Sequence, residues 1–111
     1  DFFPDKIIID ENKIDLIYND FFWMTRAYSV LIENIKTVRV NTGPFFASLS
    51  MEVAGFEANP DPINFLWKSE AICAKRIILG LMACTKEHID FSGHRAHEVR
   101  QIVEEIGRAS D

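Results

Sequence analysis

Three histidines lie close together in the last quarter of the chain and are the first residues that could bind a ligand. His94 and His97 are three residues apart, Glu98 follows His97, and His88 precedes the pair. On a helix, residues three apart share a face, so this group could hold a metal ion. Because no cysteine or spaced carboxylate motif accompanies the histidines, we interpret them as solvated residues around a helix start and predict no metal site.

Two further groups of side chains could carry acid–base or nucleophilic chemistry. Carboxylates on one helix could exchange protons with a substrate, but the charged outer face of an amphipathic helix has the same composition. The serines lack the histidine and acid order of a nucleophile motif, and neither GxGxxG nor GxxxxGK[ST] occurs. We therefore predict that the chain is not an enzyme, with no catalytic residue and no cofactor. The residues considered are Glu98, Glu104, Glu105, Ser48, Ser50 and Ser69.

The two cysteines, Cys73 and Cys84, lie eleven residues apart inside one predicted helix. At 1.5 Å rise per residue their Cα atoms are ~16 Å apart, which is well beyond the spacing that a disulfide allows. We therefore expect two unpaired core thiols in a reducing compartment, which favours a cytoplasmic location.

The composition indicates one globular domain over residues 1–111. The chain is 48% hydrophobic and 26% charged, which suits a single core. Its net charge of −5 repels phosphates and its twelve Lys and Arg residues are scattered, so we expect no nucleic-acid partner. We expect neither a signal peptide nor a membrane span. Since the sequence opens at Asp1 and not at Met, it is compatible with a fragment of a longer protein, whose other parts could hold a membrane tether.

Short apolar alternations predict strands between about residues 6 and 67. The run 6–10 and the run 13–18 read as a hairpin around a polar turn at 10–12, and Asn19-Asp20 reads as a break before a long strand that starts at Phe21. Glu33-Asn34 interrupts that strand. The run 35–40 has a mixed alternation, whereas 45–53 alternates cleanly, and 63–67 follows a proline-containing loop.

The pattern changes to helix after residue 68. We predict helices over about 69–88 and 94–107, with Ser69 as an N-cap, Glu70 in the first turn and Gly107 just past the end of the second helix. Strands followed by helices predict an α+β fold: a curved antiparallel sheet or partly open barrel followed by two C-terminal helices.

The segment 29–53, SVLIENIKTVRVNTGPFFASLSMEV, resembles the middle of bacterial pleckstrin-homology-like (PH-like) domains. In these domains a strand ending in a polar-Asn-Ile step leads to a Val-rich strand, a Gly-containing turn and a returning strand. The segments 68–93 and 98–107 resemble the helical ending of small bacterial proteins with such domains. The resemblance implies a barrel that binds lipid headgroups or peptides, or that oligomerises, so it does not by itself define a role.

In lipid-binding members the loop between the first two strands carries basic residues that grip phosphates. Here that loop is IIDENKI, in which Asp10 and Glu11 accompany the single cation Lys13. We therefore expect no phosphoinositide binding.

Aromatic residues are more numerous than a core of this size requires. Consecutive strand residues point to opposite faces, so one ring of each Phe-Phe pair is expected outside, where the C-terminal helices cover some of the rings. We predict a non-catalytic interaction or assembly module that binds a protein partner or self-associates. A small-ligand or lipid-binding domain, with a pocket between sheet and helix, stays open as the alternative. The candidate interface residues are Phe21, Phe22, Trp23, Phe45 and Phe46.

Overall fold

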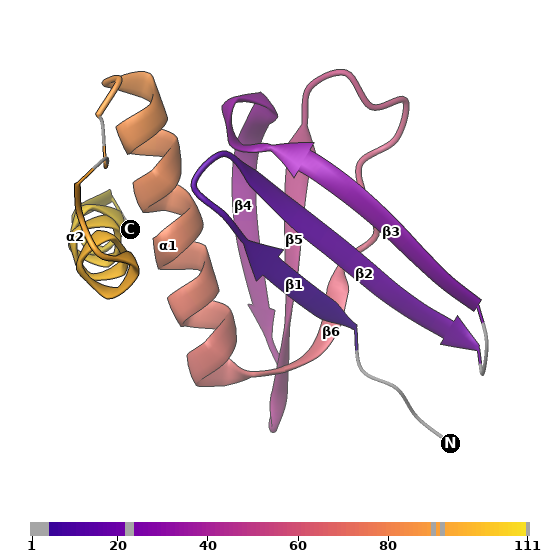
Figure 1. The fold of residues 1–111 in the computed structure, drawn as a ribbon. Helices are drawn as coiled ribbons and strands as arrows, with labels where there is room; N and C mark the ends of the chain where they lie inside the picture. Colours follow the sequence, from indigo (N-terminus) through magenta and orange to yellow (C-terminus); the bar gives the residue numbers. More distant parts are fainter. Residues whose placement is uncertain (1–4, 22–23, 90, 92, 111) are drawn as a thin grey trace.

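Alternating apolar residues and polar turns give six strands, which are followed by two helices (Figure 1). The computed structural model describes residues 5–21, 24–89, 91 and 93–110, with 20, 21, 109 and 110 described by their backbone alone. The elements are β1 (Lys6–Ile9), β2 (Lys13–Phe21), β3 (Met24–Leu31), the 3-10 helix η1 (Ile32–Asn34), β4 (Ile35–Thr42), β5 (Phe46–Val53), β6 (Ile63–Trp67), α1 (Lys68–Lys86) and α2 (Ala96–Ser110).

The α+β class and the six antiparallel strands are confirmed. Within the described ranges the strands form two open three-stranded sheets, with orders β1-β2-β3 and β4-β5-β6. The short helix η1 leads the chain from one sheet to the other. The strands therefore form two sheets where the sequence suggested one curved sheet. The expected polar turn at residues 10–12 is present, since the Asp10 N–H donates to the Lys13 carbonyl at 2.8 Å.

The predicted break at Asn19-Asp20 is wrong, because β2 continues to Phe21. Asn19 pairs with Thr25 of β3, whose hydroxyl donates to the Asn19 side-chain oxygen at 3.3 Å. Polar residues are stable there because the hairpin edge is solvated and the cross-strand pair satisfies both groups. Phe21 therefore ends β2 and does not begin a long strand. Phe22 and Trp23 lie outside the described residues.

A bulge explains the mixed alternation of β4. The partners of Ile35 and Thr37 are adjacent residues of β5, so Lys36 is an extra residue in the ladder. A bulge shifts the alternation by one residue. Ile35 before the bulge is buried, and Val38 and Val40 after it also pack against the core.

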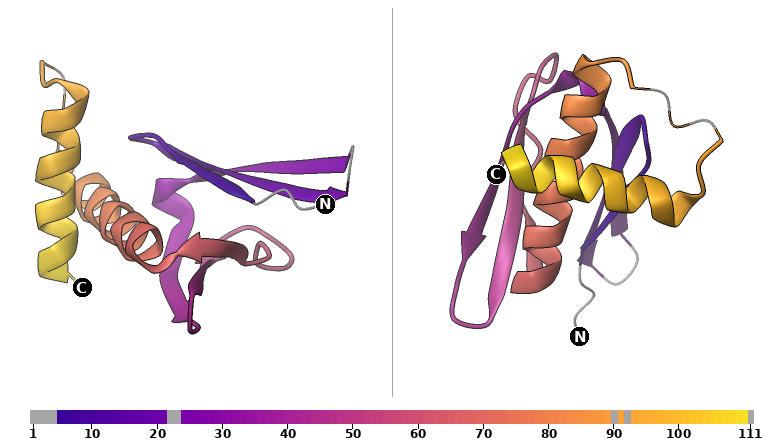
Figure 2. Two further views of the ribbon diagram at one scale, coloured as in Figure 1. Left: turned by 90° about the horizontal axis from the view of Figure 1, so that it is seen from below. Right: turned by 90° about the vertical axis from the view of Figure 1, so that its left-hand side faces the viewer.

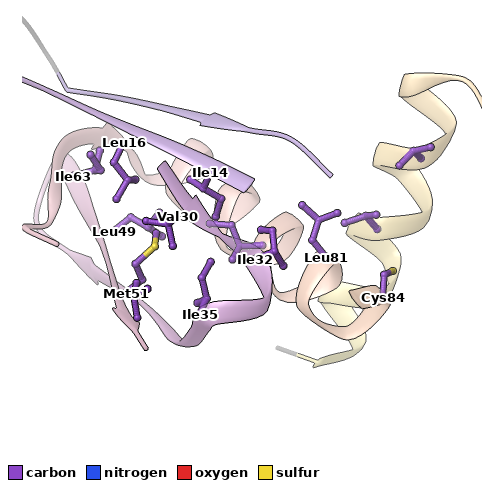
Figure 3. Close-up of a cluster of buried hydrophobic side chains, with 14 of the residues drawn as sticks. Ile14, Leu16, Val30, Ile32, Ile35, Leu49, Met51, Ile63, Leu81 and Cys84 are labelled. Atoms are coloured by element: carbon purple, nitrogen blue, oxygen red, sulfur yellow. The ribbon is translucent and has the colours of Figure 1, made fainter. Parts of the chain in front are cut away.

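The hydrophobic core lies between the inner faces of the two sheets, and α1 closes one side of it (Figures 2 and 3). The first sheet contributes residues such as Ile14 and Leu16, the second Leu49 and Ile63, and α1 contributes Ile78, all of them fully buried. The small residues Ala71 and Ala74 of α1 are also buried and let the helix approach the sheets closely.

The loop between β5 and β6 closes the side of the core opposite α1. The Tyr18 hydroxyl of β2 donates to the Asp61 backbone carbonyl at 2.5 Å. The Arg26 guanidinium bonds the Asp61 carboxylate at 3.2 Å and lies 4.9 Å from the centroid of the Tyr18 ring. Burial, assisted by the negative charge of Asp61, raises the pKa of Tyr18 to about 12, so the phenol stays neutral and keeps its donated hydrogen bond.

The helix boundaries differ from the predicted ones at two capping residues. Helix α1 starts one residue before Ser69, and Trp67 is its N-cap. The Trp67 backbone N–H donates to the Glu70 carboxylate at 3.2 Å. This is the bond that a glutamate in the third helical position makes to the N-cap backbone in a capping box. Gly107 does not end the second helix, because α2 continues to Ser110.

Helix α2 crosses α1 at a steep angle (Figure 2), and Gly107 lies at the contact between them. A Cβ atom at Gly107 would overlap the Arg76 carbonyl of α1, and one at Gly80 would overlap the Val103 carbonyl of α2. Each helix thus has one position without a side chain, where the backbone of the other helix packs. The two glycines set the distance between the helix axes.

Replacing Gly107 with alanine should destabilise the protein. In a solvated helix this change stabilises by about 1 kcal/mol, because alanine is the better helix former. Here the methyl group meets a backbone carbonyl, so we expect a loss of roughly 1–3 kcal/mol in the free energy of unfolding. Urea denaturation measures the change, with the exposed α2 substitution Gln101→Ala as control. A stabilised Gly107→Ala protein would contradict the close crossing.

Candidate interaction surface

Three aromatic side chains gather on the outer face of the β4-β5-β6 sheet. Phe46 of β5 lies edge-on to Phe65 of β6, with ring centroids 5.9 Å apart, and 5.2 Å from the ring of Trp67. Exposed fractions are 41% for Phe46, 52% for Phe65 and 60% for Trp67. Phe45, which directly precedes β5, is 76% exposed. We name Phe45, Phe46, Phe65 and Trp67 the aromatic patch.

A second bulge, in β6, creates this patch. Ala47 pairs with Leu66 while Leu49 pairs with Ile63, so β6 holds one residue more than β5 between these pairs. Without the extra residue, Trp67 would share the inner face of Ile63, because residues four apart in a regular strand point the same way. The bulge keeps Leu66 half-buried and turns Trp67 outward.

Phe65 lies in the bulge with a φ of 63°. Bulky residues rarely adopt this left-handed conformation, and such a residue costs on the order of 1–3 kcal/mol unless its surroundings hold it. The protein therefore keeps a strained backbone at a position whose side chain is exposed. Strain of this kind concentrates at binding sites, where the geometry serves the contact surface.

The expected alternation of Phe45 and Phe46 is wrong, since both rings are exposed. Phe45 lies in the turn before β5, where the Gly43 N–H donates to the Phe46 carbonyl at 2.7 Å, so strand alternation does not apply to it. Of the other candidates, Phe21 has no described side chain, and Phe22 and Trp23 fall outside the described ranges. Sequence patterns missed Phe65 and Trp67 because strict alternation from Ile63 places both of them inside.

The helices do not cover the aromatic patch within the described part of the chain. Helix α1 packs against the inner side of the sheet, and α2 packs on the far side of α1 (Figures 1 and 2). The expectation that the C-terminal helices cover outward rings is therefore wrong for this face. Both helices are already engaged with each other and with the core.

Toward the other end of β5 from the aromatic patch, the same face of the sheet is polar. The Thr37 hydroxyl of β4 donates to the Glu52 carboxylate of β5 at 3.1 Å. Arg39 is paired with Ser50 in the ladder. This part of the face thus holds the cation Arg39 and the carboxylate Glu52, at the far end of β5 from the aromatic patch.

The residues whose types could support catalysis or metal binding lie on separate elements. Ser48 and Ser50 are on β5, Ser69 is in α1, and the histidines lie between the end of α1 and the first turn of α2. His94 precedes α2, so it does not share a helix face with His97, and its Nδ1 is 3.6 Å from the Glu98 carboxylate in the first turn of α2. Among the described residues, no group of three His, Cys, Asp or Glu side chains is placed to hold a metal ion.

Both cysteines are unpaired and lie in α1, which confirms that one helix contains them. Cys84 is buried, and burial raises the pKa of its thiol. Cys73 is half-buried at the contact with α2, where its sulfur is 3.7 Å from both the Glu104 carboxylate and the Arg100 guanidinium. The expectation of two core thiols therefore holds for Cys84 alone.

A groove of about 400 Å³ runs between the first hairpin and the two helices. Its floor is apolar and its mouth carries two carboxylates and one guanidinium. The floor residues are Ile8, Ile9, Ile77, Leu81, Val99 and Val103, Ala96 adjoins them, and the mouth residues are Asp10, Glu11 and Arg100. A small-ligand function requires a pocket between sheet and helix, and this groove is one such pocket.

Comparison of the chain with protein-family models, curated proteins and solved structures found no match. In the described residues, no helix is long and apolar enough to cross a membrane.

The two cysteines should react with thiol reagents at different rates. Because burial hides Cys84 and raises its pKa, little thiolate is available there, and we expect Cys73 to be modified first in the native protein. Mass spectrometry of Cys73→Ser and Cys84→Ser proteins during labelling measures the two rates, and denaturant should equalise them. Faster native labelling of Cys84 would contradict its placement.

Proposed function

We propose that this chain is a non-catalytic interaction module of PH-like fold that binds a protein through its aromatic patch. The observation that carries this proposal is the bulge in β6, which holds Phe65 in a strained conformation and turns Trp67 outward. A sheet that served the core alone would gain stability from a regular β6 with fewer exposed rings. Retaining the strain is understandable if the exposed rings contact a partner.

The energetics of the patch support binding. Taking about 200 Å² for one aromatic side chain, the four rings expose roughly 450 Å² of surface. The largest apolar patch on a typical monomer is in the range of about 300–600 Å² and is often functional. Burying one such ring contributes about 1.5–3 kcal/mol, so a few rings can offset the cost of association.

The PH-like assignment is supported by the order and packing of the elements. Two antiparallel sheets enclose one core, and a helix that follows the last strand closes one side of it. The chain differs from a seven-stranded PH barrel in having six described strands and a second helix. Unpaired thiols are compatible with the reducing cytoplasm, which we propose as the location, with any membrane tether outside this chain.

Replacing Phe65 with asparagine should abolish partner binding without loss of stability. Asparagine tolerates a positive φ, so the change removes the ring and relieves the strain. Immobilised native protein and the Phe65→Asn protein would be compared for capture from an extract of the source cells by quantitative mass spectrometry. We expect proteins that the native chain captures and the variant does not, while the melting temperature of the variant is no lower than that of the native protein.

The matched control is Phe56→Asn, which removes a 38% exposed phenylalanine in the loop beyond the other end of β5. This variant should capture the same proteins as the native chain. If Phe65→Asn and native protein capture the same set, the aromatic patch is not the binding surface. If Phe65→Asn unfolds, Trp67→Ser provides the second test, since its ring is exposed and its φ is −63°.

The groove favours a second function, binding of a small apolar ligand. Its mouth carries two carboxylates, Asp10 and Glu11, against one cation, Arg100, so it favours an amphiphile with a positive head. This candidate uses a different surface from the aromatic patch. The two functions are therefore separable by substitution.

Octylamine should raise the melting temperature more than octanoate does, because its ammonium group complements the mouth carboxylates. At ten times the dissociation constant we expect a shift on the order of 5 °C. Ala96→Phe should fill the groove and remove the shift, whereas the exposed Gln101→Phe on the same helix should not. Equal shifts for both ligands, or no effect of Ala96→Phe, would remove this candidate.

A further inference from the structure

We infer that the groove between the first hairpin and the two helices binds an extended, basic peptide segment of another protein, which adds as a strand to the free edge of β1. This inference rests on the groove-binding function proposed above and names its ligand class. Apolar side chains of the peptide would take the place of the ligand's apolar tail, and a basic side chain that of its positive head. The aromatic patch, on the other sheet, is not involved.

Strand β1 has one edge with which no other strand pairs in the described part of the chain. At the turn that follows β1, the Asp10 N–H donates to the Lys13 carbonyl at 2.8 Å, so these two residues form a hydrogen-bonded pair. Such pairs alternate with non-hydrogen-bonded pairs along an antiparallel ladder. The pairs that Ile7 and Ile9 form with β2 are therefore of the second kind. Their backbone N–H and C=O groups consequently point away from β2, toward the free edge.

The groove lies at this free edge. Ile8 and Ile9 both line it, although consecutive strand residues point to opposite faces of a sheet. A cavity that contacts both faces lies at the margin of the strand and not on one face. Figure 1 shows the turn after β1 beside α1, and the two helices line the groove from the other side. A strand added to β1 would therefore enter the groove.

An added strand would bury every second side chain in the groove. Peptide residues opposite Ile7 and Ile9 would share their face of the sheet, because directly opposite residues point the same way. Ile7 and Ile9 pack against the core on that face, and so do the groove residues of the helices. These helix residues are Ile77, Leu81, Val99 and Val103. The expected peptide therefore has apolar residues at alternate positions.

The other edge strands are less suited to this pairing. Strands β4 and β6 each carry a bulge, and bulges are a common device against the addition of a strand to an edge. Strand β3 is exposed on both faces over most of its length, so a strand added there would bury little apolar surface. The register of β1 with β2 is continuous from Lys6 to Ile9.

The charges at the mouth of the groove favour a basic peptide. Asp10 and Glu11 are exposed in the turn that follows β1. The guanidinium of Arg100 is 3.7 Å from the Cys73 sulfur, which is itself 3.7 Å from the Glu104 carboxylate. The cation is thus directed toward the contact between the helices, where a carboxylate offsets its charge. A lysine or arginine of the peptide placed opposite Asp10 would complement the turn.

The blocked pentapeptide acetyl-KVTVK-amide is the probe. Its valines can lie opposite Ile7 and Ile9, and a lysine lies opposite Asp10 in either strand direction. With about four backbone hydrogen bonds and two buried side chains, we expect a dissociation constant on the order of 0.1–1 mM, measured by NMR titration. Hydrogen exchange of the Ile7 and Ile9 amides should slow about fivefold or more near saturation. The Ile8 amide, which already faces β2, should change little.

Two N-methylated peptides are the matched pair. Methylating the amide nitrogen of the second valine removes a donor that faces β1, and we expect a loss of affinity of about tenfold or more. Methylating that of the threonine removes a donor that points away, and the affinity should stay within about twofold. Equal losses for the two peptides would overturn strand addition, as would binding without slower exchange at Ile7 and Ile9.

The acidic peptide acetyl-EVTVE-amide should bind several times more weakly than acetyl-KVTVK-amide, and equal binding would overturn the basic ligand class. Ala96→Phe should abolish peptide binding, whereas Phe65→Asn should leave it unchanged. A loss with Phe65→Asn would place the peptide on the aromatic patch and overturn the inference.

Octylamine separates this inference from the function on which it rests. If octylamine stabilises the native protein but not Ala96→Phe, and the pentapeptide does not bind at millimolar concentration, the groove takes a small ligand and the inference is overturned. If neither compound binds, the groove function fails as well. If both bind and both are lost in Ala96→Phe, the exchange of the Ile7 and Ile9 amides decides whether the peptide pairs with β1.

Discussion

Helix α1 is the element on which the other layers depend, because its apolar residues face both the sheets and α2. Ile78 and Leu81 are buried and complete the core that the two sheets enclose. Gly80, on the same helix, leaves room for the Val103 carbonyl of α2. A helix with large residues at every one of these positions could fill the core but could not also accept α2 at this distance. The alternation of large and small residues thus lets one helix serve two interfaces.

This central position of α1 has a consequence for the outer surface. Once α1 occupies the inner side of the β4-β5-β6 sheet and α2 is stacked on α1, neither helix covers the outer side within the described residues. Apolar side chains placed there face solvent. The aromatic patch is such a group, and its exposure follows from how the helices are used elsewhere.

The bulges in β4 and β6 each add one residue to a strand, but they have opposite effects on apolar burial. In β4 the extra residue Lys36 brings Val38 and Val40 toward the core after Ile35 has already faced inward. In β6 the extra residue turns Trp67 away from the core and leaves Phe65 in a left-handed conformation. The first bulge increases apolar burial, so its contribution to stability accounts for its presence. The second reduces it and leaves a strained residue, which is why we relate it to binding.

Periodicity along the sequence determined the α+β class, the order of strands and helices, the inner face of β5 and the placement of both cysteines in one helix. These features depend on neighbours a few residues apart, whose side chains alternate in a strand or recur each turn in a helix. Such local signals are present in the chain before it folds. They could not reveal the two-sheet arrangement, because the interruption at Glu33-Asn34 predicts a break between strands but not that η1 leads the chain into a second sheet.

The tertiary structure decided the role of Gly107, the register of β6 and the position of the aromatic patch. As a pattern, Gly107 reads as a helix end, but the Arg76 carbonyl that needs its missing side chain lies 31 residues earlier in the chain. Likewise, Trp67 points outward only because β6 gains one residue against β5 when Leu66 and Ile63 both pack inward. Helix crossings and strand registers are contacts between residues far apart in sequence, and their energies exist only once those residues meet.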